Sequence, residues 1–347
     1  MKKVLLITEY LNPPYDEGIK KTVYNLYLEL EKNYRTEVIC RYGFKKKNIF
    51  IVKTNPIFFS NEVYSIIKNF NPDSLIYLPF QSSTFASYIR LKILSSYSKT
   101  KNIIFIALQP KPLKKWQELV VKFLKPNFAL TPSPTLNEFW NEMEVNNKLV
   151  PLITDLSIFK PINKLSTKKG LRKKYNLPID AFIISHMGHL NEGRNLKSLI
   201  PLQKSGIQIV IVASSSTPED AKGQESLKKE LLDSGIIILD GYIEQIEEIY
   251  QLSDIYIFPV LKKNSSIGMP LSILEARACA IPVITTDYGS IKKYLQNDFG
   301  GICYSEPNNF LNSINEFNFI SQKSDNNTNV SELNDMFYHA IQNRINK

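Results

Sequence analysis

The chain has 347 residues, enough for two domains that each bury a core. Hydrophobic residues make up 43% and charged residues 22%, an ordinary globular composition that excludes a disordered chain. The formal net charge is +10, and residues 1–165 carry 24 basic against 13 acidic side chains, while the remainder is close to neutral. The basic half favours an anionic partner, such as an anionic membrane surface.

Cysteine usage and hydropathy indicate the cellular compartment of the protein. Cys40, Cys279 and Cys303 are too few and too scattered for a disulfide framework or a zinc site, which favours a reducing compartment. The apolar stretch at the start is too short for a signal peptide, and Glu9 interrupts it. No run of about 18 apolar residues occurs. We therefore expect a cytoplasmic protein, with peripheral attachment to the cytoplasmic membrane face as an option.

Short β-branched runs alternate with amphipathic helical stretches through the first half. Thr22–Leu30 is predicted to be a helix with Val23, Leu26, Tyr27 and Leu30 on one face. The predicted strands of this half are Val4–Thr8, Glu37–Cys40, Ser74–Tyr77, Ile103–Leu108 and Phe128–Thr131. This order is typical of a parallel sheet with crossover helices.

The alternation stops at Asp155–Pro161 and then restarts, which predicts two domains, 1–163 and 164–347. The segment Asn309–Asn329 is rich in Asn and Ser with a weak pattern, and Val330–Ile345 is a candidate terminal helix that crosses back. The predicted strands of this half are Phe182–Met187, Ile207–Val212, Ile236–Leu239, Ile255–Phe258, Val283–Thr285 and Ile302–Tyr304.

The predicted fold class is therefore α/β, with two tandem Rossmann-like, doubly wound domains. Ligands of open α/β sheets bind at the carboxyl ends of the strands. The expected site is a cleft across which the two domains face each other.

The stretch from Ser265 to Gly289 is the most specific part of the sequence. Gly268 lets a ligand approach the backbone, and a helix that starts near Pro270 offers free N–H groups to an anion such as phosphate. Glu275, in that helix, is suited to accept hydrogen bonds from paired sugar hydroxyls. The alternative is an ordinary strand–helix unit in which Glu275 is a solvated charge.

This stretch resembles the signature of the family 4 (group 1) retaining glycosyltransferases, which have the GT-B fold. The resemblance implies that Glu275 binds the ribose of a nucleotide-sugar donor, in a set that includes Gly268, Met269 and Leu271. Ile267 stands where the family has a glutamate that contacts the transferred sugar, so the identity of the sugar stays open. The matching residues are Glu275, Ala276, Ala278, Cys279, Pro282, Val283, Thr286, Asp287 and Gly289.

Two further stretches resemble the same family. In Met187–Asn195, the resemblance implies that His189 and Arg194 are the cations that clamp the donor diphosphate and support catalysis. The alternative is a loop histidine and a surface cation. In Gly241–Pro259, Tyr242 and Ile243 occupy the positions that lie against the nucleobase, and a half-buried loop aromatic is the alternative for Tyr242. Tyr250 and Asp254 are expected to serve the fold.

The first half matches the family only in the order of its elements. Gly18 follows the first strand, where the family often has a pair of glycines that approach the diphosphate. All three histidines lie after residue 165, whereas many family members have a cleft histidine after a strand like Ile103–Leu108. Gln109 follows that strand here and is an acceptor-side candidate, although an amide cannot take a proton.

The resemblance implies a metal-independent transferase that moves a sugar, with retention, from a nucleotide-diphosphate sugar to a glycan or lipid-linked acceptor. No cofactor and no metal site are expected, because the nucleotide sugar is a co-substrate. The main alternative is a degenerate GT-B protein that binds nucleotide or sugar without transfer. A sugar-nucleotide epimerase would need acid and base residues, and the sequence offers no candidates for them. No nucleic-acid motif supports a nucleic-acid partner.

A basic amphipathic helix is predicted within Pro110–Pro126. One interpretation is a crossover helix packed on the N-terminal sheet. The other is a membrane-surface helix beside the acceptor site, which Lys45–Lys47 could extend. Its residues are Lys111, Lys114, Lys115, Lys122 and Lys125 around Leu113, Trp116, Val120, Phe123 and Leu124.

Overall fold

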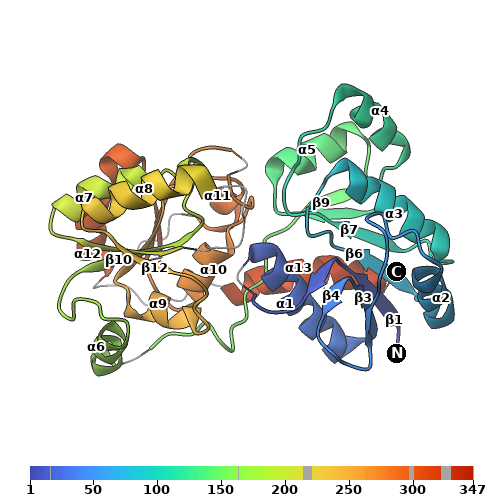
Figure 1. Ribbon diagram of the computed structural model, residues 1–347, viewed down its shortest axis with the longest axis horizontal. Helices are drawn as coiled ribbons and strands as arrows, with labels where there is room; N and C mark the ends of the chain where they lie inside the picture. Colours follow the sequence, from blue (N-terminus) through green and yellow to red (C-terminus); the bar gives the residue numbers. More distant parts are fainter. Residues whose placement is uncertain are drawn as a thin grey trace. The chain divides into compact units, whose positions relative to one another are not determined.

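The computed structural model describes residues 1–15, 17–162, 164–213, 221–263, 265–296, 301–321 and 330–346 (Figure 1). The chain forms two compact units. Unit 1 comprises Met1–Ile153, Ile267–Met269 and Leu333–Lys347, and unit 2 comprises Thr154–Ser266 and Pro270–Glu332. Within the described ranges, no helix has the length and apolar character needed to cross a membrane.

Unit 1 is built on a parallel sheet in the order β5-β3-β1-β6-β7-β8-β9. The order reverses between β1 and β6, which makes this a doubly wound sheet. A short parallel pair, β2 (Tyr10–Leu11) with β4 (Tyr42–Gly43), stands beside it. The strands of the main sheet are β1 (Lys3–Ile7), β3 (Arg35–Cys40), β5 (Ile49–Ile51), β6 (Ser74–Tyr77), β7 (Ile103–Ile106), β8 (Ala129–Thr131) and β9 (Asn147–Leu149).

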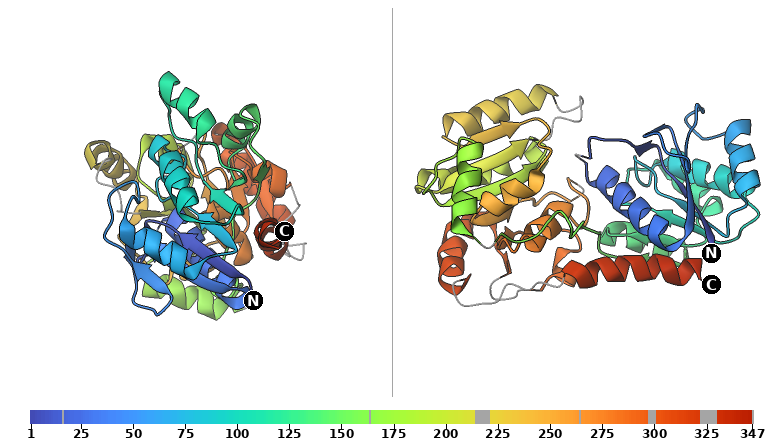
Figure 2. Two further views of the ribbon diagram at one scale, coloured as in Figure 1. Left: turned by 90° about the vertical axis from the view of Figure 1, so that its right-hand side faces the viewer. Right: turned by 90° about the horizontal axis from the view of Figure 1, so that it is seen from below.

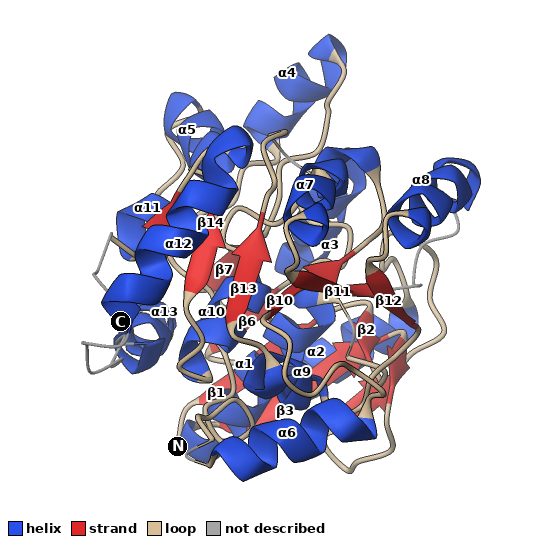
Figure 3. Cartoon of the chain, turned by 90° about the vertical axis from the view of Figure 1, so that its left-hand side faces the viewer, coloured by secondary structure: helices blue, strands red, loops and turns tan. Residues whose placement is uncertain are grey.

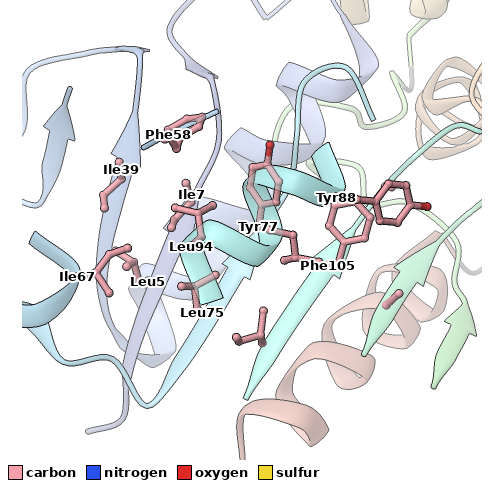
Figure 4. Packing of buried hydrophobic residues seen from close by; sticks show 14 of the residues in the cluster. Leu5, Ile7, Ile39, Phe58, Ile67, Leu75, Tyr77, Tyr88, Leu94 and Phe105 are labelled. Carbon is pink, nitrogen blue, oxygen red and sulfur yellow. The ribbon is translucent and has the colours of Figure 1, made fainter. Parts of the chain in front are cut away.

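Helices cover this sheet and enclose an aromatic-rich core (Figure 4). Ser60, Thr84 and Ser133 cap their helices by accepting a backbone N–H from the first turn. Figure 4 shows Tyr77 and Phe105 of adjacent strands beside Tyr88 of α3. The helices are α1 (Gly18–Asn33), α2 (Asn61–Phe70), α3 (Phe85–Tyr97), α4 (Lys115–Phe123), α5 (Pro134–Glu142) and α13 (Val330–Ile345).

Unit 2 has its own parallel sheet in the order β12-β11-β10-β13-β14-β15 (Figure 3). Its core is aliphatic. The strands are β10 (Ile183–Gly188), β11 (Gln208–Ala213), β12 (Ile237–Asp240), β13 (Ile255–Phe258), β14 (Val283–Thr285) and β15 (Ile302–Tyr304). The helices are α6 (Leu165–Lys174), α7 (Ile200–Lys204), α8 (Ala221–Asp233), α9 (Ile246–Leu252), α10 (Leu271–Ala278), α11 (Ile291–Tyr294) and α12 (Phe310–Ser321).

The α/β class with two doubly wound units is confirmed, and the terminal helix has the predicted bounds. Asp254 serves the fold as expected: it pairs with Lys168 and Arg172 and accepts the backbone N–H of Ile183 at 2.7 Å. Several elements escaped prediction: the edge strands β5 and β9, the short pair β2 and β4, helix α6, and α12 in the Asn-rich segment. Residues 322–329 of that segment lie outside the described residues.

Candidate functional site

The sheet of unit 2 reverses its order between β10 and β13. At such a switch point the loops after the two central strands diverge and leave a crevice at their carboxyl ends. The loop with His189 and Arg194 follows β10, and the loop that leads to α10 follows β13. Two of the stretches singled out in the sequence therefore leave the sheet from adjacent strands.

The two loops also touch. A Cβ on Gly193 would lie 2.5 Å from Oγ of Ser265, a distance that real side chains do not tolerate. Asn195, in the left-handed conformation (φ 56°), donates from Nδ2 to the carbonyl oxygen of Pro259 at 3.1 Å. A side chain at position 193 would therefore force Ser265 to move, and Asn195 fixes the loop of Arg194 to the end of β13.

Arg194 is a largely buried cation. Within the described residues its guanidinium forms no ion pair, and its Nε has no hydrogen-bond partner. Its Cζ lies 6.0 Å from the centroid of the Phe258 ring. Burial lowers the pKa of Arg194, but an arginine stays charged at neutral pH. A buried charge of this kind is suited to receive an anion.

His186, in β10, lies beside this arginine. Its ring is fully buried, and its Nδ1 lies 2.9 Å from the carbonyl oxygen of Ile257, so Nδ1 carries the proton. Its Nε2 has no partner among the described residues. Burial lowers the pKa of His186, the hydrogen bond to Ile257 raises it and the Arg194 charge lowers it, which together bring the pKa to about 3. The ring is therefore neutral at physiological pH.

Gly188 makes room for both side chains. A Cβ there would lie 3.3 Å from Nη1 of Arg194 and 3.3 Å from Nε2 of His186. Sequence reasoning nominated His189, which is half-buried in the loop, and missed His186. A histidine inside a strand of otherwise buried residues was the signal available.

Glu275 is buried in α10, with 3% of its surface exposed, so the interpretation as a solvated charge is wrong. The hydroxyl of Tyr250 donates to its Oε2 at 2.7 Å. Tyr250 comes from α9, so this hydrogen bond joins α9 to α10. Burial raises the pKa of Tyr256, the Arg194 charge lowers it and the Glu275 charge raises it, so both charges lie near this ring.

The loop between β13 and α10 is fastened by Tyr288. Its hydroxyl accepts the backbone N–H of Ser266 at 2.8 Å and donates to the carbonyl oxygen of the same residue at 2.7 Å. Pro270 is the N-cap of α10 rather than a residue of its first turn, and Leu271 begins the helix. Ile267, Gly268 and Met269 precede it in the loop and belong to unit 1 as defined above.

The remaining candidates are more dispersed. Tyr242 is about half exposed and, with Ile243, follows the edge strand β12, which β11 separates from β10. The same loop leads into α9, which carries Tyr250. In unit 1, Gly18 is the first residue of α1, and the backbone oxygen of Gln109 accepts hydrogen bonds from Ser82 and Ser83. Among the described residues, no group of three or more His, Cys, Asp or Glu is placed to hold a metal ion.

Residues 190–317 match the family described as glycosyl transferases group 1. The UDP-Gal:alpha-D-GlcNAc-diphosphoundecaprenol alpha-1,3-galactosyltransferase of Escherichia coli is 28% identical over 181 residues, 48% of this chain and 43% of that protein. The N,N'-diacetylbacillosaminyl-diphospho-undecaprenol alpha-1,3-N-acetylgalactosaminyltransferase of Campylobacter jejuni is 25% identical over 48% of this chain and 43% of its own length. The chain thus spans less than half the length of these curated relatives.

Solved structures resemble the chain over nearly all of its length. Anabaena Alr3699/HepE in complex with UDP-glucose has a TM-score of 0.71 and 14% identity, covering 99% of this chain and 100% of that one. A glycosyltransferase from Rickettsia africae has a TM-score of 0.72 and 16% identity, covering 99% of this chain and 93% of its own. At these identities the likeness concerns the fold.

Proposed function

We propose that the chain transfers a sugar from a nucleotide-diphosphate sugar to a lipid-linked or glycan acceptor, with retention of configuration, because residues 190–317 match the group 1 glycosyl transferases and the fold is GT-B. The observation that carries the proposal is Arg194: its Nε is buried, and its guanidinium has no anionic partner in the described residues, at the switch point of the unit 2 sheet. A diphosphate supplies the missing negative charge.

In this proposal Arg194, His189 and the N-terminus of α10 near Gly268 neutralise the diphosphate, so no metal ion is needed. Glu275, held by Tyr250, accepts the ribose hydroxyls. The nucleobase is assigned to Tyr242 and Ile243. Ile267, Met269 and Leu271, which flank Gly268 and open α10, line the donor, and Gly18 approaches the diphosphate.

The transfer does not require a protein side chain to act as acid or base, because the leaving group takes the proton. The bond between the anomeric carbon and the donor phosphate oxygen breaks, and the acceptor oxygen bonds to that carbon on the same face. The acceptor proton passes to an oxygen of the departing nucleoside diphosphate. The protein orients the two substrates and stabilises the negative charge that develops on the leaving group, which is the task of Arg194.

On the acceptor side, Gln109 contacts a lipid-linked acceptor. The acceptor lies in an anionic membrane, which the protein meets at the cytoplasmic face. The Escherichia coli and Campylobacter relatives are named for diphosphoundecaprenol and diphospho-undecaprenol substrates. The excess of basic residues in the first 165 positions is complementary to such a surface. Three free cysteines fit a cytoplasmic location.

A second candidate function is nucleotide or sugar binding without transfer. Three departures from the family favour it: Ile267 in place of the glutamate, a single glycine at position 18, and a first half without histidine. Turnover of any nucleotide sugar excludes this candidate.

Thermal unfolding in the presence of UDP, GDP and their sugars tests donor binding, since a ligand at about 100 times its Kd adds about 2.7 kcal/mol of stability. Arg194→Ala is expected to lower kcat/KM by about 100-fold. Glu275→Ala is expected to weaken nucleotide binding about tenfold to 100-fold. The matched control is Lys197→Ala, which removes an exposed cation already paired with Glu230 at 2.6 Å.

The stability of the ligand-free variants separates binding from a structural role. Because Arg194 has no anionic partner in the described part of the chain, Arg194→Ala leaves the ligand-free protein as stable as the wild type or more so. Loss of stability without loss of nucleotide binding would show that Arg194 is structural and would overturn the assignment.

A further inference from the structure

Helix α4 presents an apolar ridge to solvent. Of its nine residues only Val121 is buried. Trp116, Leu119, Val120 and Phe123 are 54%, 61%, 37% and 82% exposed. Their spacing of i, i+3, i+4 and i+7 places all four on one face, opposite Val121. α4 connects β7 and β8 as a crossover helix and packs on the core through Val121, but the opposite face with these four side chains is exposed.

The ridge is held in place by its surroundings. Leu113 and Leu124, which flank α4, pack against the core of unit 1. The Trp116 ring meets the ring of Phe85 of α3 edge-on, with centroids 5.2 Å apart. Figures 1 and 3 show α4 standing out from the rest of unit 1. The apolar side chains are therefore exposed on an ordered element.

Positive charge accompanies the ridge. Lys114, Lys115 and Lys122 are exposed and form no ion pair within the described ranges. Lys111 and Lys125 flank the helix, and Glu118 is the acidic residue within it. A ridge with Trp, Leu and Phe beside several lysines has the chemistry of a helix that lies in the headgroup region of an anionic bilayer.

We propose that α4 is the membrane-docking surface of this protein: Trp116, Leu119, Val120 and Phe123 enter the interface of an anionic bilayer, and Lys114, Lys115 and Lys122 bind its headgroups. The inference rests on the membrane partner named in the proposed function. Lys45–Lys47 does not extend the surface, because Lys46 pairs with Glu31 at 2.7 Å and the preceding strand β4 lies across unit 1 from α4 in Figure 1.

Two observations favour a bilayer over a second copy of the chain. A stable protein interface buries about 1,200–2,000 Å² in total, more than four side chains provide. A symmetric contact through α4 would also bring two lysine clusters together, with like charges opposed. An anionic bilayer is complementary to both the ridge and the lysines.

Co-sedimentation with vesicles of phosphatidylcholine, with and without phosphatidylglycerol, tests the proposal without donor or acceptor, so its failure is distinguishable from failure of transfer. Binding is expected only to the anionic vesicles. Trp116 supplies a second readout, because the other tryptophan, Trp140, is fully buried. A blue shift of tryptophan emission on binding reports entry of Trp116 into the interface.

Phe123→Ser is expected to lower the partition coefficient about tenfold, and Lys115→Gln and Lys122→Gln about fivefold each. Phe59→Ser is the matched control: Phe59 is 65% exposed in the same unit but outside α4, and its loss leaves binding unchanged. Absence of binding to anionic vesicles, equal loss in the control, or a dimer in sedimentation that Phe123→Ser dissociates would each overturn the proposal.

Discussion

His186, which is buried in β10, and Arg194, in the loop that follows β10, lie beside each other. The sequence nominated Arg194 through the resemblance of Met187–Asn195 to the glycosyltransferase family, while His186 lay inside a buried run where side-chain direction could not be known. The three-dimensional position of Gly188, which a Cβ would bring within 3.3 Å of both, explains how they coexist. The positions of charged groups could thus be predicted from the sequence, but the partners that tune them could not.

His186 makes stability depend on pH. In the unfolded chain its pKa is near 6.5, whereas in the folded protein it is about 3, so the unfolded state binds more protons between these values. Stability therefore falls as the pH drops from about 7 toward 3. Between about pH 7.5 and about pH 5.5 this group removes about 1.4 kcal/mol of unfolding free energy.

Urea unfolding at the two pH values measures this loss. His186→Gln is expected to remove the part of the pH dependence of the unfolding free energy that His186 contributes. His339, which is exposed in α13, provides the control His339→Gln. An unchanged slope in the His186 variant would contradict a neutral, buried imidazole.

The predicted bounds of β6, β13, β14 and β15 are those observed. β6, β13 and β14 are interior strands that are buried throughout, which gives a clear apolar run, whereas β15 is an edge strand whose short run was nevertheless recognisable. The edge strands β5 and β9 have three residues each and leave no detectable period. Helix α12 lies in the Asn-rich segment, but half of its twelve residues are apolar, and Phe310 and Ile314 pack in the core of unit 2.

The Tyr288 hydroxyl holds the conformation of the loop before α10. Tyr288→Phe removes both hydrogen bonds to the backbone of Ser266 and leaves a buried N–H without its acceptor. We expect the unfolding free energy to fall by about 1–3 kcal/mol, measured by urea unfolding. The hydroxyl of Tyr294 is buried without a partner among the described residues, so Tyr294→Phe should cause no comparable loss. Equal effects of the two variants would argue against this role.

On the scale of the whole molecule, the chain leaves unit 1, forms unit 2 and returns. Helix α13 lies along unit 1 in the right-hand view of Figure 2. Lys2 donates from Nζ to the carbonyl oxygen of Ile345 at 2.8 Å, and Asn102 donates to that of Arg344 at 2.8 Å. The sequence predicted two domains and a terminal helix that crosses back, but the individual contacts join residues 343 and 242 positions apart and left no local signal.

A substitution of Phe337, which is fully buried in α13, tests whether α13 belongs to unit 1. Phe337→Ala is expected to lower the stability of unit 1 by about 3–5 kcal/mol. Hydrogen exchange should accelerate in β1 and β6 and stay unchanged in β10 and β13. Met336→Ala, at an exposed neighbouring position, is the matched control. Faster exchange confined to unit 2 would contradict the assignment of α13 to unit 1.

Because α13 belongs to unit 1 but comes last in the chain, unit 1 is completed only at the end of synthesis. A ribosome makes the seven strands of the first sheet early, but it delivers the helix that completes their unit only after the whole of unit 2. During translation unit 2 can finish folding while unit 1 still lacks Phe337 and its neighbours. The nascent first unit therefore waits longest for its last element, and the apolar surface that α13 covers stays exposed until the helix emerges.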